Sequence, residues 1–290
     1  MTADRFRFDG QTPCTLSDLP TGAGDAREDK PRYLSRTAAN LEEMGRLQDG
    51  FYADGREGLV IILQALDAAG KDSTVKHVMG GLNPQGVTVH SFKQPSAEEL
   101  AHDFLWRANR ALPPRGGIAI FNRSYYEDVL VVQVHDLQKT YRMPPRTTEA
   151  GQREFFRRRY RQIRDYERYL YENGYRVLKI FLNVSKEKQK ERFLERIETP
   201  AKNWKFSESD LKERALFDEY AQVIGKVITA TATPDCPWYV IPADQKWYTR
   251  YLVSELVADA LRQSCHEYPT LPDETRARLR ECRRQLEEED

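Results

Sequence analysis

The stretch that decides the fold runs from residue 58 to residue 73 and reads GLVIILQALDAAGKDS. Its first half, GLVIILQA, is a short apolar run rich in β-branched residues, which is typical of a strand buried on both faces of a parallel sheet. Its second half joins this strand to a helical pattern through small residues, one glycine and one lysine. The spacing matches the phosphate-binding pattern GxxxxGK[ST] in its essentials. The stretch therefore predicts a strand, a phosphate-binding turn and a helix in succession.

The turn departs from the standard pattern at two positions. Ala65 stands where the first glycine is expected, and Asp72 follows the lysine where serine or threonine is usual. Small residues still let backbone N–H groups approach an anion, the glycine gives conformational freedom, and the helix N-terminus and the lysine add positive charge. We therefore expect phosphate contacts from a set of residues in the turn and the helix after it: Ala68, Ala69, Gly70, Lys71, Asp72, Ser73 and Lys76.

A carboxylate inside the turn indicates a metal ion. Asp67 would repel phosphate unless a cation lay between them, so we expect it to hold Mg²⁺, or Mn²⁺ in its place, directly or through water. Ser73 is a second candidate, because the hydroxyl that normally follows the lysine is missing. The alternative is an ordinary Ala/Gly-rich turn with a solvated lysine. The position of the turn directly after a buried strand favours the phosphate site.

A second group of functional residues follows the apolar run GIAIFN (117–122). P-loop enzymes place a metal-holding carboxylate at the end of such a strand, but here the residue is Asn122, which would bind Mg²⁺ or its waters weakly. Glu127 and Asp128 are the nearby acids that can supply the missing charge, although either one singly can equally be an ordinary charge at a helix N-terminus. Arg123 is expected to clamp phosphate oxygens, because its planar guanidinium matches them.

A third group forms a basic helix end followed by a basic loop. Arg192 and Arg196 are four residues apart and share one helix face, and Lys202 and Lys205 follow in the loop before Ser207 begins a new helix. A cationic lid over about 192–214 would close on phosphate and exclude water. The alternative is an exposed helix–loop–helix without such a role.

Apolar runs alternate with helical patterns along the rest of the chain. Besides GLVIILQA, the runs are VTVHSF (87–92), GIAIFN (117–122), YRVLKIFLNV (175–184) and WYVIPA (238–243). Helical patterns cover roughly 32–48, 71–81, 96–111, 151–172, 186–197, 208–228 and 247–265. This alternation predicts an α/β fold with a doubly wound, five-stranded, mainly parallel sheet. We expect one catalytic domain over 31–265, an irregular arm over 1–30 and a charged C-terminal helix over 266–290.

Composition and charge limit the class of protein. The chain has 290 residues, 40% hydrophobic and 31% charged, which fits a soluble globular protein. It lacks an apolar run of about 18 residues and a signal peptide, and its four cysteines are scattered, so we expect a cytoplasmic protein without disulfides, zinc or membrane contact. The net charge is zero, yet residues 139–196 carry 17 Lys/Arg against 8 Asp/Glu. This excess predicts an anionic partner.

Taken together, these segments resemble the polyphosphate kinase 2 family. The resemblance covers about 35–260, in the order and spacing of the family, and rests on five segments: DAAGK (67–71), NPQG (83–86), SFKQPSAEEL with FLWR (91–107), FNRSYYEDVLV (121–131) and RFLERIETPAKNWKFSESDLKER (192–214). The segment FNRSYYED has Asn where other members have Asp in DRSWY, which is similar to the class III branch.

The resemblance implies a P-loop kinase-like, three-layer αβα sandwich with a five-stranded, mainly parallel sheet and a helical lid. It also implies transfer of the terminal phosphoryl group of inorganic polyphosphate to AMP and ADP, giving ADP and ATP reversibly, with Mg²⁺ essential. It implies that Asp67, Lys71 and Arg123 are catalytic and that metal contacts come from Asp67, Asn122 and Glu127, with Glu127 compensating for the missing carboxylate at Asn122. Nucleotide and lid contacts are implied for Lys93, Arg107, Arg192, Arg196, Lys202 and Lys205. A homodimer or homotetramer is also implied, and the basic segment 139–196 is then expected to form part of a track for a long polyanion.

Two other functions fit part of the sequence. An ATP-dependent nucleoside or nucleotide kinase of the same fold would normally carry a complete GxxxxGK[ST], so Ala65 and Asp72 disfavour it. A non-enzymatic polyanion- or nucleic-acid-binding module would use the basic segment with its interleaved tyrosines, Tyr160, Tyr166 and Tyr169. Their helical spacing favours core positions, and Asp67 would be unexplained. No nucleic-acid partner is therefore expected.

Overall fold

A single sheet of six strands forms the centre of the molecule. The computed structural model describes residues 1–149 and 151–289. The strands follow the order β1-β6-β5-β2-β4-β3. All five predicted strands are present and are mutually parallel: β2 (Gly58–Ala65), β3 (Val87–Ser91), β4 (Ile118–Asn122), β5 (Tyr175–Asn183) and β6 (Trp238–Pro242). The α/β prediction is therefore confirmed, and the carboxyl ends of these strands meet at one edge of the sheet.

The predicted number of strands is wrong by one. The sixth strand, β1 (Arg7–Phe8), pairs antiparallel with β6 at the edge of the sheet. It lies in the segment 1–30 that we expected to be irregular, where a 3₁₀ helix, Thr2–Phe6, also buries Ala3 and Phe6. A strand of two residues has no readable alternation of polar and apolar side chains, so the sequence pattern does not reveal it.

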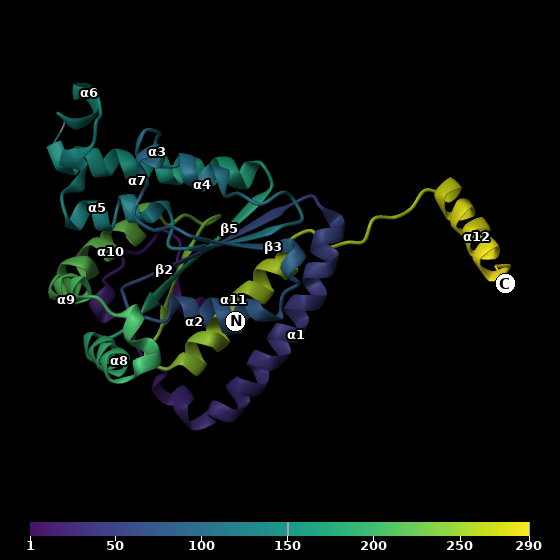
Figure 1. The fold of residues 1–290 in the computed structure, drawn as a ribbon, viewed down its shortest axis with the longest axis horizontal. Helices are drawn as coiled ribbons and strands as arrows, with labels where there is room; N and C mark the ends of the chain where they lie inside the picture. The colour runs from purple at the N-terminus through teal and green to yellow at the C-terminus, as the bar shows by residue number, and fades with distance from the viewer. Residues whose placement is uncertain (150, 290) are drawn as a thin grey trace.

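Helices cover both faces of the sheet, which gives the three predicted layers (Figure 1). Three helices cover one face: α1 (Lys30–Asp54), α2 (Lys71–Val78) and α11 (Lys246–Gln263). The other face is covered by two longer helices and two short ones: α7 (Gly151–Glu172), α10 (Phe217–Thr231), α4 (Trp106–Arg110) and α5 (Val131–Val134). The short helices α3 (Ala97–Leu100) and α6 (Pro145–Thr148) lie at the edge of this layer and bury none of their residues. Two further helices, α8 (Lys186–Glu198) and α9 (Glu208–Ala215), stand near the carboxyl ends of the strands.

Alternation along the strands builds two separate cores. In β2, Leu59 and Ile61 face the layer of α1 and α11, whereas Val60 and Ile62 face the layer of α7 and α10. All four side chains are at most 1% exposed. Because both faces of β2 are buried, the strand reads as a continuous apolar run rather than as an alternating one.

Two predicted helices are each divided into two in the structure. The pattern over 96–111 divides into α3 and α4, because Asp103 accepts from the N–H of Leu105 and begins a new turn. The pattern over 208–228 divides at Leu216 into α9 and α10. Conversely, α1 is longer than predicted and continues to Asp54. Gly55, with a left-handed φ of 65°, then caps the C-terminus of the helix.

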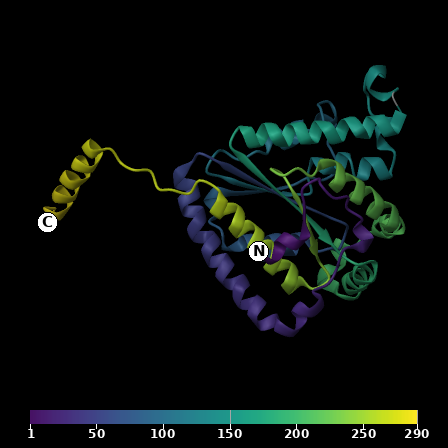
Figure 2. The same cartoon turned by 180° about the vertical axis from the view of Figure 1, so that it is seen from behind.

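The last helix, α12 (Asp273–Glu287), lies away from the body of the molecule at the end of an extended segment (Figures 1 and 2). None of its residues is buried. Over the described ranges 1–149 and 151–289, no helix has both the length and the apolar character that crossing a membrane requires.

The two ends of the chain should contribute very differently to stability. Removing residues 270–290 should change the free energy of unfolding by less than about 0.5 kcal/mol, because α12 buries nothing. Removing residues 1–9 should lower it by about 2–4 kcal/mol, because Phe6 is 5% exposed and the N–H of Ala3 donates to buried Glu255. Urea denaturation of both truncated proteins measures the difference. Equal losses would contradict this account of the termini.

Candidate active site

The turn between β2 and α2 has the backbone of an anion-binding loop. Ala68 and Gly70 both have left-handed backbone angles, with φ of 60° and 109°. Gly70 adopts this conformation without steric cost, whereas Ala68 is held in it by its surroundings. Lys71 is the first residue of α2, so the helix N-terminus and its unpaired N–H groups open onto the turn. The predicted phosphate residues from Ala68 to Ser73 are therefore contiguous at one edge of the sheet.

Lys71 lies over the turn rather than in solvent. Its ammonium donates to the carbonyl of Ala65 at 2.8 Å and to that of Leu66 at 3.4 Å. The side chain is only 8% exposed. Burial, together with the nearby charge of Arg123, lowers the pKa of Lys71 to about 8. A poorly hydrated cation held at the turn is well suited to an incoming phosphate.

Arg192 stabilises the phosphate turn by hydrogen bonds to its backbone carbonyls. We predicted it as a lid residue, but the structure places its guanidinium against backbone carbonyls: Ala68 at 2.9 Å, Ala69 at 2.7 Å and Ala243 at 2.7 Å. Arg192 is on the buried face of α8 with Gln189, whose amide donates to the carbonyl of Asp67 at 3.0 Å. Arg192 therefore supports the turn instead of facing outward from the lid.

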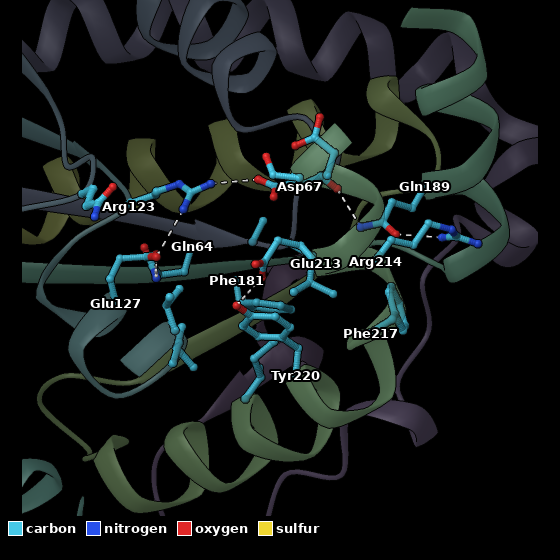
Figure 3. A pocket seen from close by; sticks show the side chains of 18 residues that line it. Gln64, Asp67, Arg123, Glu127, Phe181, Gln189, Glu213, Arg214, Phe217 and Tyr220 are labelled. Carbon is cyan, nitrogen blue, oxygen red and sulfur yellow. Dashed lines mark hydrogen bonds and ion pairs between the residues drawn. The ribbon is translucent and has the colours of Figure 1, made fainter. Parts of the chain in front are cut away.

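Asp67, Arg123 and Glu127 converge beside the turn. The guanidinium of Arg123 donates to Asp67 at 2.8 Å and to Glu127 at 3.3 Å. Gln64, near the end of β2, donates to the other oxygen of Glu127 at 2.8 Å. Arg123 directly follows β4 and has a left-handed φ of 64°. The adjacent strands β2 and β4 thus bring together two groups that lie more than fifty residues apart in the sequence (Figure 3).

Two departures from the usual P-loop enzyme pattern contact each other: Asp72 after the lysine, and Asn122 at the end of β4. The amide of Asn122 donates to the carboxylate of Asp72 at 2.9 Å. An aspartate at position 122 would place two carboxylates at this distance and would repel Asp72. The asparagine at the strand end and the aspartate after the lysine therefore compensate for one another electrostatically.

Asp128 is separated from this group, although it is next to Glu127 in the sequence. Its carboxylate pairs with Arg159 at 3.0 Å and accepts from the hydroxyl of Tyr141 at 2.7 Å. Burial raises the pKa of Asp128 above its ordinary value. Of the two acids that follow β4, only Glu127 faces Asp67 across Arg123.

A cavity of about 440 Å³ opens next to Asp67 and Arg123. In Figure 3, Phe217 and Tyr220 lie on the other side of the cavity from Arg123 and Glu127, and Phe181 of β5, the register partner of Gln64, lies between them. The hydroxyl of Tyr220 donates to Glu213 at 2.7 Å, and burial with the charge of Glu213 raises the pKa of that tyrosine, so it stays protonated. The wall therefore combines aromatic surface with fixed polar groups, which is typical of a small-molecule site.

Most of this cavity wall was missed from the sequence. The residues that we did not predict include Gln64, Gln94, Phe181, Gln189, Phe217 and Tyr220, whereas Asp210, Glu213 and Arg214 lie within the predicted lid 192–214 without having been predicted as site residues. Gln64 was the one detectable signal, because it is polar inside an otherwise apolar strand. The others come from α8, α9, α10 and the ends of β3 and β5, and only the tertiary arrangement brings them together.

The predicted lid cations are near the turn but paired with protein groups. Lys205 is 4.0 Å from Asp72, Arg196 is 3.9 Å from Asp210, and Lys202 pairs with Glu195. The loop Pro200–Lys205 is a 3₁₀ helix between α8 and α9. The lid therefore reaches the phosphate turn through Lys205.

The three remaining predicted cations lie in two other places. Arg107 in α4 donates to the carbonyl of Lys93, just after β3, at 2.8 Å. Both residues lie outside the cavity wall. Lys76 is exposed in the last turn of α2. None of these three side chains lines the cavity beside Asp67.

The basic segment 139–196 includes α6, α7, β5 and most of α8, and the arginines of α7 differ in exposure. Arg153, Arg161 and Arg164 are exposed, whereas Arg159 is buried against Asp128. Tyr160 and Tyr166 pack against the core, as their spacing predicted, but Tyr169 is 58% exposed.

The oxygen ligands at the turn fit a lightly held Mg²⁺ ion. Within the part of the chain that the structure describes, no three His, Cys, Asp or Glu side chains converge as a ready-made metal site. Mg²⁺ characteristically binds one or two carboxylates and takes its other ligands from water and substrate phosphate. Asp67 and Glu127, on either side of Arg123, match that requirement.

Comparison with known proteins gives one consistent family. The family model described as Polyphosphate kinase 2 matches residues 27–269. An ADP-polyphosphate phosphotransferase of Rhodopseudomonas palustris is 43% identical over 97% of both chains. An AMP/ADP-polyphosphate phosphotransferase of Meiothermus ruber is 41% identical over 83% of this chain and 85% of its own. The crystal structure of Polyphosphate Kinase 2 from Arthrobacter aurescens TC1 superimposes with a TM-score of 0.83 at 35% identity, covering 96% of both chains.

Phosphate binding should weaken as the pH rises through the pKa of Lys71. The ammonium form binds the anion, and its pKa of about 8 in the free protein lies below the ordinary value, so charge is lost above pH 8. The dissociation constant for tripolyphosphate should rise about tenfold from pH 7 to pH 9. Isothermal titration calorimetry measures it, with Lys71→Arg as the control, because arginine keeps its charge and the ligand titrates identically. The same rise in Lys71→Arg would rule out Lys71 as its source.

Proposed function

Because this chain belongs to the polyphosphate kinase 2 family, we propose that it transfers the terminal phosphoryl group of inorganic polyphosphate to AMP and ADP, reversibly giving ADP and ATP. The observation that carries the proposal is the Asp67–Arg123 pair, which lies between the phosphate turn and the cavity. The names of the Rhodopseudomonas and Meiothermus relatives support the donor and both acceptors.

The donor and the acceptor occupy adjoining places in this proposal. Polyphosphate lies on the turn, where the amides before and within α2 and the ammonium of Lys71 neutralise its end. The nucleotide lies in the cavity, whose volume of about 440 Å³ suits a small molecule. Phe217 and Tyr220 give an apolar surface for the base, and Arg123 at the junction contacts the phosphates of both substrates.

Transfer at this junction needs positioning and charge neutralisation more than proton transfer. The nucleophile is a phosphate oxygen that is already anionic, so a strong general base is unnecessary. This agrees with a cavity wall that contains no histidine among the described residues. Lys71 and Arg123 oppose the negative charge on the transferring group, and Asp67 keeps Arg123 directed toward the junction.

Asp67 and Glu127 are the residues that would hold Mg²⁺, with Asn122 contributing indirectly through Asp72. When bound, the ion neutralises phosphate oxygens and fixes the two substrates relative to each other. The lid cations Arg196, Lys202 and Lys205 then exclude water from the transferring group, which suppresses hydrolysis.

The family resemblance supports a homodimer or homotetramer, and the four free cysteines support a cytoplasmic location. Two of the four, Cys14 and Cys236, are buried, and burial raises the pKa of each thiol to about 12. Such thiols remain protonated and inert in a reducing compartment.

A donor exchange assay tests the proposed reaction directly. Purified protein supplied with ADP, Mg²⁺ and polyphosphate should form ATP, and with AMP it should form ADP and then ATP. Luciferase luminescence and chromatography of the nucleotides measure the products. The matched reaction, with ATP as the only donor and a nucleoside or AMP as acceptor, examines the ordinary kinase alternative. Absence of ATP from the polyphosphate reaction, with activity in the second, would replace the proposal by that alternative.

Replacing Asp67 should separate catalysis from polyanion binding. Asp67→Asn keeps the side-chain shape but removes the charge that organises Arg123 and the metal, so kcat should fall by about 10²–10³-fold. Affinity for polyphosphate should stay equal or increase, because a negative charge beside the anion is lost. Asp273→Asn, at the start of the exposed helix α12, is the control and should leave both quantities unchanged. Unchanged turnover in Asp67→Asn would refute the assigned role.

A further inference from the structure

A charged pair lies inside the core where an apolar pair would be expected. Lys179 is in the middle of β5, between Val177 and Phe181, and is 0% exposed. Its ammonium donates to Glu167 of α7 at 2.6 Å, and Glu167 is 1% exposed. Replacing buried ion pairs by apolar residues of similar volume is often neutral or stabilising. Stability alone is therefore a weak explanation for this pair.

Two tyrosines attach the pair to the segment after β4. The hydroxyls of Tyr125 and Tyr126 both donate to the same oxygen of Glu167, at 2.9 and 2.7 Å. Lys179 satisfies the other oxygen, and it also donates to the hydroxyl of Tyr126 at 3.2 Å and to the carbonyl of Thr231 at 2.9 Å. Tyr125 and Tyr126 are 2% and 0% exposed. Each charged group in this network therefore has its hydrogen-bond partners, as a buried network requires.

The tyrosines lie in the sequence between the two residues that face Asp67. Arg123 precedes them and Glu127 follows them, in the order Arg-Ser-Tyr-Tyr-Glu. Arg123 has a left-handed φ of 64°, a conformation that persists only when the surroundings fix it. The N–H of Arg123 is held by the carbonyl of Leu63 at 3.0 Å. The backbone is fixed a second time on the C-terminal side of Arg123, where the hydroxyls of Tyr125 and Tyr126 are bonded to Glu167.

We propose that Tyr125 and Tyr126, held by the Glu167–Lys179 pair, are positioning residues for phosphoryl transfer. The buried carboxylate of Glu167 accepts a hydrogen bond from both hydroxyls, so the short segment between β4 and α5 keeps one conformation. That conformation places the guanidinium of Arg123 between Asp67 and Glu127. The rings alone would fill the core equally well as phenylalanines, so the hydroxyls and the charged pair serve the geometry of Arg123. This inference rests on the proposed function for its activity measurement.

Tyr126→Phe tests the role of the hydroxyl, with Tyr251→Phe as the matched control. Tyr251 is also 0% exposed and donates to a buried carboxylate, that of Glu255 at 2.7 Å, but it lies in α11 on the opposite face of the sheet. Both variants should lower the thermal midpoint by a similar few degrees. Tyr126→Phe should lower kcat about tenfold, whereas Tyr251→Phe should leave kcat unchanged. An equal loss of kcat in both variants would show a general effect of stability.

A double-mutant cycle distinguishes positioning of Arg123 from other effects. In an Arg123→Ala background, Tyr126→Phe should change kcat by less than about twofold, because the group that it positions is already absent. A full tenfold loss in that background would overturn the inference. The same four proteins are also titrated with tripolyphosphate, where the loss of affinity in Tyr126→Phe should likewise disappear in the Arg123→Ala background. If the wild-type chain binds tripolyphosphate but transfers nothing, the proposed function fails, and this binding cycle still decides the positioning role.

Discussion

The phosphate turn depends on the bonds between the guanidinium of Arg192 and the carbonyls of Ala68 and Ala69. A peptide unit is planar and its N–H and C=O point in opposite directions, so fixing the carbonyl of Ala69 turns the N–H of Gly70 away from Arg192. The N–H of Ala69 instead donates to the carbonyl of Leu66 and closes the turn. Ala68 is held with a positive φ by this contact, and Gly70 completes the turn. Arg192, which we predicted to be a lid residue, therefore stabilises the phosphate turn, and its helix α8 connects the turn to the lid.

Charge around the turn is arranged in pairs rather than accumulated. Asp67 and Glu127 share Arg123, and Asp72 is bonded to Asn122. Lys71, like Arg192, is bonded to neutral carbonyls instead, and burial lowers the pKa of Lys71 to about 8. A lysine bonded to carbonyls keeps most of its electrostatic attraction for an arriving anion, whereas the paired groups are already oriented before any ligand binds.

The sequence was sufficient for the features that depend on local patterns. β-branched runs predicted the five parallel strands, and the spacing from Asp67 to Ser73 predicted the turn, because neighbouring residues determine both. It was insufficient where distant segments decide the outcome. Nothing local shows that Arg192 faces inward, that Asn122 meets Asp72, or that α9 and α10 close the cavity with Glu213 and Tyr220. The two-residue strand β1 was missed because it is too short to display a period.

The position of α12 has a practical meaning for the chain as a whole. This helix buries none of its residues and is joined to the body only by an extended segment (Figure 2). A fusion partner, an affinity tag or a surface linkage placed at this end would therefore neither strain the sheet nor obstruct the cavity beside Asp67. The carboxyl terminus is thus a natural handle by which the enzyme can be immobilised while its catalytic edge stays open to solvent.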